Sequence, residues 1–215
     1  MKILITGTSS GIGKAMAELF VENNHTVIGI DWNPSTINNK LYTHIQKNIC
    51  DKDLPDIKDI EILINNAGVQ NSDDDIEINL KGAIAITEKY GIQDKIKSIV
   101  FIASTSATTG AEFPIYSASK GGILAYMKNT ALRVAKYGAT CNSISPGGVT
   151  TPLNDHILKN PNLWQQVLDE TLLDKWASAK EIAEFAYFIS VVNKSMTGQD
   201  IIVDNGEILK SNFIW

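Results

Sequence analysis

The opening stretch of about thirty residues constrains the fold more than any other part of the chain. An apolar run over 2–6 leads into Thr6-Gly-Thr-Ser-Ser-Gly-Ile-Gly13, which is followed by apolar residues at helical spacing and by a second apolar run over 26–30 that ends at Asp31. A strand, a glycine turn, a helix, a second strand and an acidic residue in this order are typical of a dinucleotide-binding unit. The glycines let the backbone approach a pyrophosphate, which lies at the helix N-terminus.

The remainder of the chain alternates between strand-like and helix-like patterns. Further apolar runs predict strands over 42–46, 60–64, 97–103, 139–144 and 199–203. Helical spacing of apolar residues predicts helices over 76–90, 116–136 and 179–192. This alternation indicates an α/β fold with a Rossmann-type, doubly wound parallel sheet and helices on both faces. We expect one domain over residues 1–215, with a substrate-capping region of short helices at about 150–175.

Composition excludes several classes of function. The chain has 215 residues, which suits a single domain, and its net charge of -5 gives no basic footprint for nucleic acid. Apolar runs reach only about six residues, far short of a membrane span. The N-terminus enters a strand pattern at once, so we expect a cytoplasmic protein without a signal peptide or a membrane partner. Cys50 and Cys141 show no metal spacing; a disulfide is possible in principle, and two buried thiols are favoured.

A phenol and an ammonium lie four residues apart in Tyr116-Ser-Ala-Ser-Lys120. Positions i and i+4 share one face of a helix, so both side chains can point into one cleft. A free tyrosine has a pKa near ~10, and a neighbouring positive charge favours the phenolate and lowers that pKa. Tyr116 could therefore exchange a proton with an alcohol or a carbonyl. Taken alone, the pair is better explained as two residues on a solvated helix face, because a five-residue pattern with two fixed positions is common by chance.

In order, the motifs of this chain resemble those of the short-chain dehydrogenase/reductases. The matching pieces are Thr6-Gly-X-X-X-Gly-Ile-Gly13, Asp51, Asn65-Asn-Ala-Gly68, Asn79, Ser104, Tyr116-X-X-X-Lys120, Asn142-X-X-X-Pro146-Gly147, Thr151, and Thr197-Gly198 ahead of Val203-Asp204. The resemblance covers nearly the whole chain and implies hydride transfer between a nicotinamide ring and an alcohol or carbonyl. It implies Tyr116 as general acid/base and Lys120 as the group that lowers the Tyr116 pKa and holds the ribose. It also implies Ser104 as the group that polarises the substrate oxygen, and Asn79 as the anchor of a water.

The resemblance also assigns the cofactor contacts. The pyrophosphate turn would be lined by Gly7, Ser10, Ile12 and Gly13. Asp51 would face the adenine edge, and Asn66 would face the adjoining ribose. The backbone of Val149 would hold the carboxamide, and Thr151 would lie nearby.

The choice of cofactor follows from charge. Asp31 would repel a 2′-phosphate and accept a hydrogen bond from a free 2′-hydroxyl. Ser10 and Trp32 occupy the places where NADP-preferring relatives carry Arg or Lys, and after the strand no basic residue appears until Lys40. We therefore expect NAD as cofactor.

Two departures from the family pattern leave alternatives open. The segment from Gly68 to Asn79 is several residues shorter than the family pattern, which bears on the expected homo-oligomer, a dimer or a tetramer. The spacing from Ser104 to Tyr116 is about one residue short, so Ser106 is a second candidate for the polarising serine.

Several residues have ordinary structural explanations. The three histidines, His25, His44 and His156, have no partners in spacing and are expected to be structural or solvated, with no metal site. The acids at 73–75 predict a solvated helix start. Trp164 and Trp176 either line an apolar pocket or pack the capping region. The apolar tail ending at Trp215 could dock against another subunit.

The leading interpretation is an NAD-dependent oxidoreductase acting on a small secondary alcohol or ketone. Two alternatives remain: an acyl-thioester ketoreductase that uses NADPH, and a non-catalytic dinucleotide sensor on the same fold. The sequence identifies neither the substrate nor the physiological direction of the reaction.

Overall fold

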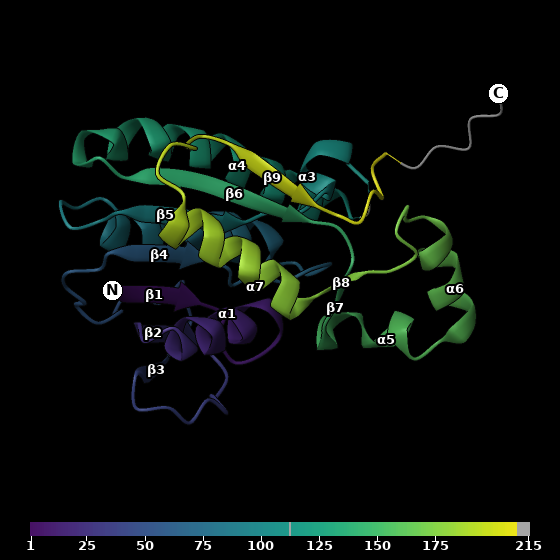
Figure 1. The fold of residues 1–215 in the computed structure, drawn as a ribbon, viewed down its shortest axis with the longest axis horizontal. Helices are drawn as coiled ribbons and strands as arrows, with labels where there is room; N and C mark the ends of the chain where they lie inside the picture. Colours follow the sequence, from purple (N-terminus) through teal and green to yellow (C-terminus); the bar gives the residue numbers. More distant parts are fainter. Residues whose placement is uncertain (112, 210–215) are drawn as a thin grey trace.

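A parallel sheet of seven strands lies at the centre of the computed structural model, which describes residues 1–111 and 113–209. The strands are β1 (Lys2–Thr6), β2 (Thr26–Asp31), β3 (Tyr42–Gln46), β4 (Ile62–Asn65), β5 (Ser98–Ile102), β6 (Thr140–Pro146) and β9 (Asp200–Val203). Their spatial order is β3-β2-β1-β4-β5-β6-β9, so the chain starts in the middle and winds outward in both directions (Figure 1). The predicted doubly wound sheet is confirmed, and the crevice between β1 and β4 is its topological switch point.

The central strands are buried on both faces, which explains their unbroken apolar runs. Ile3, Leu4 and Ile5 of β1 have no exposed surface, and neither have Ile62, Leu63 and Ile64 of β4. Parallel strands covered by helices on both sides lack the polar alternation of a one-sided sheet. The unbroken apolar runs in the sequence therefore reflect the burial of these strands between two helical layers.

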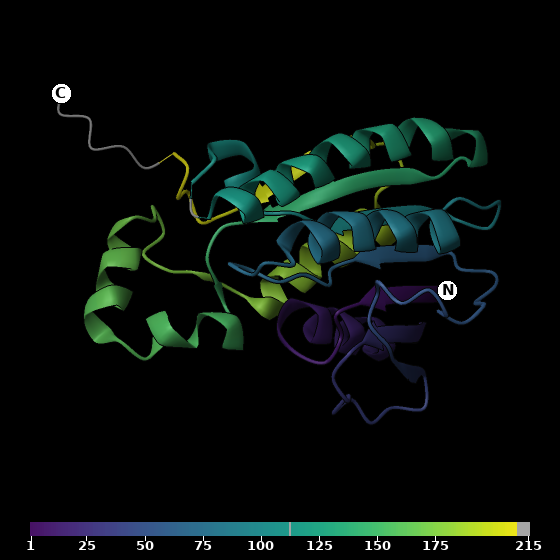
Figure 2. The ribbon, with the colours of Figure 1, turned by 180° about the vertical axis from the view of Figure 1, so that it is seen from behind.

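Helices form a layer on each face of the sheet. One face is covered by α1 (Gly11–Glu22) and α7 (Ala179–Tyr187), which pack on each other around Phe20 and Met16. The other face is covered by α4 (Pro114–Val134) and by a helical segment made of η1 (Asp75–Gly82), α2 (Ala83–Ile86) and η2 (Thr87–Gly91) (Figure 2). Two short extensions, η3 (Ala135–Tyr137) and η5 (Phe188–Val192), continue α4 and α7.

The segment between β6 and α7 forms a lid at the carboxyl edge of the sheet. It contains η4 (Pro152–Asn154), α5 (Asp155–Leu158) and α6 (Pro161–Asp169), and we call residues 150–175 the lid. The strands β7 (Val149–Thr150) and β8 (Ala177–Ser178) pair in parallel and join the two ends of the lid (Figure 1). The predicted short helices over 150–175 are confirmed.

Some sequence expectations differ from the structure. A short helix, α3 (Ser106–Thr109), follows β5 and was not predicted. Helix α4 begins at Pro114, two residues before Tyr116, because proline is well suited to the first turn of a helix. In α7, apolar spacing would place Phe185 beside the buried Ile182 and Ala186, but its side chain is exposed. The tail over 211–215, including Trp215, lies outside the described residues.

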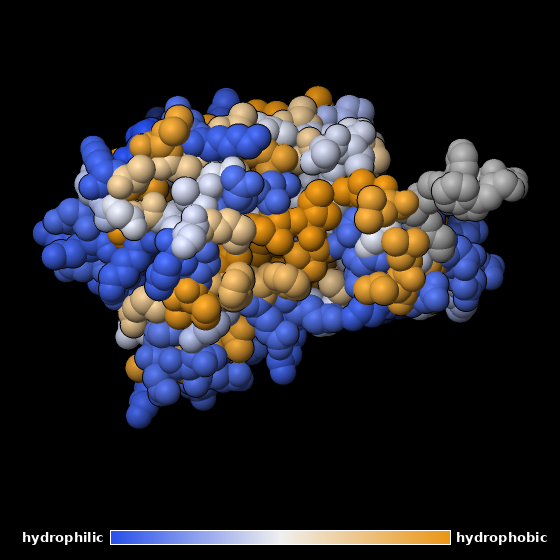
Figure 3. Space-filling model, turned by 45° about the horizontal axis from the view of Figure 1, so that its top comes forward, coloured by the Kyte–Doolittle hydropathy of each residue, from blue (hydrophilic) through white to orange (hydrophobic). Residues whose placement is uncertain are grey.

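Both cysteines are free thiols, with Cys141 buried and Cys50 half-buried. Among the described residues, no helix is long and apolar enough to cross a bilayer. Exposed apolar side chains gather over α7, η5 and the edge strand β9, where Figure 3 shows orange atoms across the middle of the face. They belong to Phe185, Phe188, Val192 and Ile202.

Candidate active site

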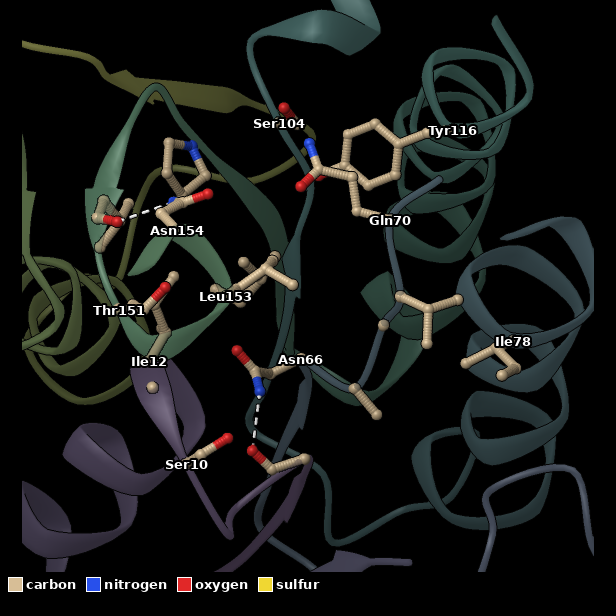
Figure 4. Close-up of a pocket in the computed structure, with 18 of the residues that line it drawn as sticks. Ser10, Ile12, Asn66, Gln70, Ile78, Ser104, Tyr116, Thr151, Leu153 and Asn154 are labelled. Atoms are coloured by element: carbon tan, nitrogen blue, oxygen red, sulfur yellow. Dashed lines mark hydrogen bonds between the residues drawn. The ribbon is translucent and has the colours of Figure 1, made fainter. Parts of the chain in front are cut away.

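A cavity of about 970 Å³ opens at the carboxyl ends of the strands, between the glycine turn and the lid. Its walls come from the ends of β1, β2, β4, β5 and β6, from the start of α4, and from the lid. Figure 4 shows Ser10, Ile12 and Asn66 at one end of the cavity and Ser104, Gln70 and Tyr116 at the other, with Leu153 between them. The cavity therefore runs from the glycine turn to the tyrosine.

The glycine turn is packed too tightly for side chains. A Cβ on Gly13 would collide with the carbonyl oxygen of Gly7, and Gly7 itself has a φ of 75°, in the left-handed region that favours glycine. The Asn66 side-chain amide donates to the carbonyl oxygens of Thr6 at 3.0 Å and Gly7 at 3.1 Å. Gly7, Ser10, Ile12 and Asn66 line the cavity as expected, whereas Gly13 lies behind the turn and sets its shape.

Asp31 ends β2 with a carboxylate that is already oriented. Its two oxygens accept hydrogen bonds from the backbone N–H groups of Ser9 at 2.9 Å and Asn33 at 2.8 Å. The side chain is mostly buried and lines the cavity beside Trp32. A fixed negative charge therefore lies at the end of the glycine turn, where the sequence predicted it.

Asp51, expected at the adenine edge, is not among the described residues that line the cavity. Its carboxylate accepts a hydrogen bond from the backbone N–H of Asn48 at 3.1 Å and so shapes the turn after β3. The cavity wall in this region consists of Lys47, Asn48 and Ile49 instead, and Lys47 is paired with Asp53 at 2.6 Å.

Ser104 and Ser106 form a hydrogen-bonded pair after β5. The Ser106 hydroxyl donates to the Ser104 Oγ at 2.9 Å, and the Ser106 backbone N–H lies 3.2 Å from the same oxygen. Because Ser104 Oγ accepts from Ser106, its own hydroxyl hydrogen is available to a third group. Ser104 lines the main cavity together with Tyr116, whereas Ser106 lines a smaller neighbouring cavity.

Tyr116 and Lys120 lie one turn apart on α4. The Lys120 Nζ lies 5.6 Å from the centre of the Tyr116 ring and donates to the Ile102 carbonyl oxygen at 3.0 Å. Lys120 is buried, and this burial lowers the pKa of its ammonium to about 8, although the negative charge of Asp75 acts in the opposite direction. The structure thus brings the tyrosine, the lysine and Ser104 to one end of the cavity.

Asn79 is buried in η1 and acts as a clamp. Its Oδ1 accepts from the backbone N–H of Val69 at 2.7 Å, while its Nδ2 donates to the Val69 carbonyl at 2.9 Å and to the Ser119 hydroxyl at 3.1 Å. The amide therefore fastens the loop after β4 to helix α4, which carries the tyrosine and the lysine. This contact also explains why an asparagine is tolerated within a helix.

The acidic run over 73–75 was expected to be solvated, and for Asp75 this expectation is wrong. Asp75 starts η1 and is 1% exposed, and its Oδ1 accepts from the Ser72 backbone N–H at 3.3 Å. The cause is helix geometry, because Asp75 lies four residues before Asn79 and shares its inward face. Its charge reaches Lys120, whose pKa it raises against the effect of burial.

The lid side of the cavity carries residues that the sequence analysis assigned and others that it missed. Val149 and Thr151 line the cavity as expected, and the Asn154 side chain donates to the Val149 carbonyl at 2.8 Å. Additional lining residues of the substrate end are Gln70, Phe113, Leu153, His156, Trp176 and Glu207. The sequence analysis left Trp176 between pocket lining and lid packing and expected His156 to be structural or solvated. The other four residues belong to no motif and could not have been found from spacing.

The two tryptophans differ in their roles: Trp176 lines the cavity, and Trp164 packs against Trp176. Trp176 lines the cavity with its ring against Gly148, where a Cβ would collide with the indole. Trp164 packs edge-on against Trp176, with ring centroids 5.5 Å apart. Of the histidines, His156 is exposed at the cavity rim, whereas His44 contacts Tyr42 and the Asn33 carbonyl. No group of metal-ligating side chains large enough to hold an ion occurs in the described part of the chain.

Comparison with known proteins gives consistent matches along the chain. A family model described as Enoyl-(Acyl carrier protein) reductase matches residues 7–207. The L-rhamnose-1-dehydrogenase of Scheffersomyces stipitis is 30% identical, over 95% of this chain and 94% of that protein. The 3-oxoacyl-[acyl-carrier-protein] reductase FabG of Thermotoga maritima is 28% identical, over 96% of this chain and 97% of that protein. A solved structure of 4-hydroxyisoleucine dehydrogenase complexed with NADH superposes with a TM-score of 0.87 at 27% identity, covering 98% of this chain and 99% of the other.

Proposed function

The chain belongs to the short-chain dehydrogenase/reductase family, and on that premise we propose that it transfers a hydride between NAD(H) and a secondary alcohol or ketone. Members of this family are oxidoreductases that bind a nicotinamide dinucleotide. The residues of the cavity fit such a cofactor, because the glycine turn leaves backbone where a Cβ would collide and lies at the N-terminus of α1. When bound, the cofactor supplies the hydride acceptor or donor, and the protein supplies position and a proton.

One observation carries this proposal: Tyr116 and Lys120 share a face of α4 beside Ser104, at the far end of the same cavity as the glycine turn. In the oxidative direction, the Tyr116 phenolate takes the hydroxyl proton of the alcohol while the carbinol C–H bond breaks. In the reductive direction, the phenol returns that proton to the forming alkoxide. The Lys120 ammonium, held by the Ile102 carbonyl, favours the charged phenolate.

Ser104 is the group proposed to bind the substrate oxygen. Its hydroxyl accepts from Ser106, and a hydroxyl that accepts a hydrogen bond becomes a stronger donor. Ser106 is then a positioning residue that orients Ser104. Asn79 keeps its proposed role as the anchor of a water. Its side-chain amide also holds the loop at Val69 against Ser119 of α4.

NAD is proposed as the cofactor because of Asp31. Two backbone N–H groups fix its carboxylate at the end of the glycine turn. A 2′-phosphate placed there would meet a buried negative charge, whereas a ribose diol would find an acceptor. A ketoreductase that uses NADPH remains the second candidate, and the FabG relative at 28% identity favours it.

We also propose a single catalytic domain acting on a small molecule in the cytoplasm as a homo-oligomer. The exposed apolar side chains of Phe185, Phe188, Val192 and Ile202 support self-association, because monomers rarely expose contiguous apolar surface.

The experiment is a fluorescence titration of the pure protein with NADH and with NADPH, followed by turnover with a panel of alcohols and ketones at the reduced-nicotinamide absorbance band. We expect tighter binding of NADH by at least about tenfold and turnover of at least one secondary alcohol. Tighter binding of NADPH would contradict the assignment of Asp31. Tight binding without any turnover would favour the sensor over the enzyme.

A further inference from the structure

A carboxylate lies at the substrate end of the cavity, on a segment that the proposed chemistry does not use. Glu207 follows β9 through a turn in which its N–H donates to the Asp204 carbonyl at 3.1 Å. Its Oε2 accepts from the Gly148 backbone N–H at 3.2 Å and lies directly beside Gly147, where a Cβ would collide with it. The side chain is half-buried and lines the same cavity as Tyr116 and Ser104.

The sheet fixes how far Glu207 lies from the reacting centre. Ser104 comes just after β5, Gly147 just after β6 and Glu207 just after β9, and these three strands are neighbours in the sheet. The strand ends are in register, because the Thr105 N–H donates to the Pro146 carbonyl at 3.0 Å and the Gly147 N–H donates to the Val203 carbonyl at 3.1 Å. Strands lie about 4.8 Å apart, so the backbone at Gly147 is roughly 5 Å from that at Thr105, the neighbour of Ser104. The Glu207 carboxylate contacts Gly147 and Gly148, so it lies within the length of a small substrate from Ser104.

Hydroxyl groups surround the other side of Glu207. A smaller cavity of about 260 Å³ adjoins the main one, is lined by Thr105, Ser106 and Thr109, and shares Glu207 with it. The Ser106 hydroxyl continues into Ser104 through a 2.9 Å hydrogen bond. The Glu207 carboxylate therefore lies between the Ser104 end of the main cavity and the hydroxyl-bearing residues of the smaller one, and hydroxyl groups both donate and accept.

Trp176 supplies the apolar part of this end. Its ring lies against Gly148, the same residue whose N–H binds Glu207, and Trp164 supports the ring edge-on. An aromatic ring beside a carboxylate suits a molecule with an apolar C–H face and hydroxyls around it. Sugars and polyols have this combination, whereas a simple amino alcohol would use the carboxylate alone.

We propose that the substrate is a polyol or sugar, in which hydroxyl groups flank the reacting carbinol carbon and one of them donates a hydrogen bond to Glu207. This proposal rests on the proposed function. The reaction is unchanged: the carbinol carbon loses a hydride to NAD⁺, its hydroxyl loses a proton to Tyr116, and a carbonyl group forms.

The test compares four substrate classes with NAD⁺: four- to six-carbon polyols and aldoses, 3-pentanol, 3-hydroxybutyrate and 1-amino-2-propanol. We expect the highest kcat/KM in the first class. Glu207→Gln should lower kcat/KM for the best polyol or sugar by about tenfold, mainly through KM, because hydrogen bonds to charged groups are stronger than neutral ones. The same variant should change 3-pentanol turnover less than about twofold, because that substrate has no second hydroxyl that could donate a hydrogen bond to Glu207.

Two controls separate failures of the inference from failures of the proposed function. Glu184→Gln, an exposed residue of α7, should leave all four rates unchanged, and Glu207→Gln should bind NADH like the wild type. Preference for the hydroxy acid or the amino alcohol, or an equal effect of Glu207→Gln on every substrate, overturns the polyol assignment alone. Absence of NADH binding or of turnover with every class overturns the proposed function and this inference together.

Discussion

The two walls of the cavity are built in different ways. The strand-edge wall, which we define as the glycine turn over 7–13, Ser104, and the start of α4 over 116–120, is held by backbone hydrogen bonds and buried side chains. The lid has no buried residue in η4, α5 or α6. A wall that performs chemistry needs fixed geometry, whereas a wall that selects substrates can vary without loss of the fold.

The lid is nevertheless fastened at two places. Where its two ends meet, the Ala177 N–H donates to the Gly148 carbonyl at 3.3 Å, beside the β7–β8 pair. Near its C-terminal end, the N–H groups of Leu172 and Leu173 lie 3.0 and 3.2 Å from the Asn205 carbonyl. The difference between the walls is thus one of internal packing. It implies that substitutions in the strand-edge wall change chemistry or folding, and that substitutions in the lid change substrate affinity.

The largest expected effect is on Lys120, where activity and stability should change in opposite directions. Lys120→Met removes the ammonium and should lower kcat by about 10³, within the range of general acid–base catalysis. The same change should stabilise the fold, because the folded-state pKa of about 8 lies below the ordinary value of 10.5. The unfolded chain then binds more protons than the native one between these values, so burial of the charge costs up to about 3 kcal/mol below pH 8 and progressively less above it.

Thermal unfolding measured from pH 7 to pH 10 tests whether Lys120→Met is more stable than the wild type, as expected. The melting temperature of Lys120→Met should exceed that of the wild type at pH 7 by several degrees, at about 2–4 °C per kcal/mol, and the difference should shrink as pH rises. A variant less stable than the wild type at pH 7 would mean that the native contacts of Lys120 outweigh its desolvation.

The serine pair gives the next largest effect. Ser104→Ala should lower kcat by about 10², because a hydrogen bond to the developing alkoxide is lost. Ser106→Ala should cost only about threefold, through looser orientation of Ser104. Steady-state kinetics of both variants against one substrate are sufficient. A silent Ser104→Ala with an inactive Ser106→Ala would transfer the polarising role to Ser106.

The glycine turn should be intolerant of a single methyl group. Gly13→Ala places a Cβ against the Gly7 carbonyl, and we expect a loss of about 3 kcal/mol in unfolding free energy or a comparable loss of NADH affinity. Gly121→Ala is the matched control, since the nearest neighbour of its Cβ would be the Ala107 carbonyl at 3.7 Å. In a helix this control should stabilise the protein slightly. Equal stability and NADH affinity for both variants would contradict the tight packing described here.

The smallest effect is expected in the lid. Leu153 lines the cavity and its side chain is mostly exposed. Leu153→Ala should raise KM for substrate about threefold and leave both the melting temperature and kcat nearly unchanged, because it removes contacts made equally before and during the reaction. A fall in melting temperature of more than about 4 °C would show that the lid packs as firmly as the strand-edge wall.

The same contrast explains how far the sequence could predict the structure. The bounds of β3 and the placement of Asp31 followed from local patterns, because strand alternation and glycine turns are decided by near neighbours. Asp75 was misjudged because the face of η1 that it shares with Asn79 is buried only by tertiary packing against α4. Glu207 was missed because its role depends on the adjacency of β6 and β9, whose strands are distant in sequence.

The central claim is that Tyr116, supported by Lys120, carries the proton. The most direct test is the pH dependence of kcat/KM for alcohol oxidation in Tyr116→Phe, with Tyr126→Phe on the same helix as control, since that phenol bonds Glu88 at 2.7 Å, away from the cavity. The account predicts a rate in the wild type and the control that rises with pH through an ionisation below the ordinary tyrosine value of ~10. It predicts a residual rate about 10³ lower, without that ionisation, in Tyr116→Phe. Wild-type turnover and an unchanged pH profile in Tyr116→Phe would contradict it.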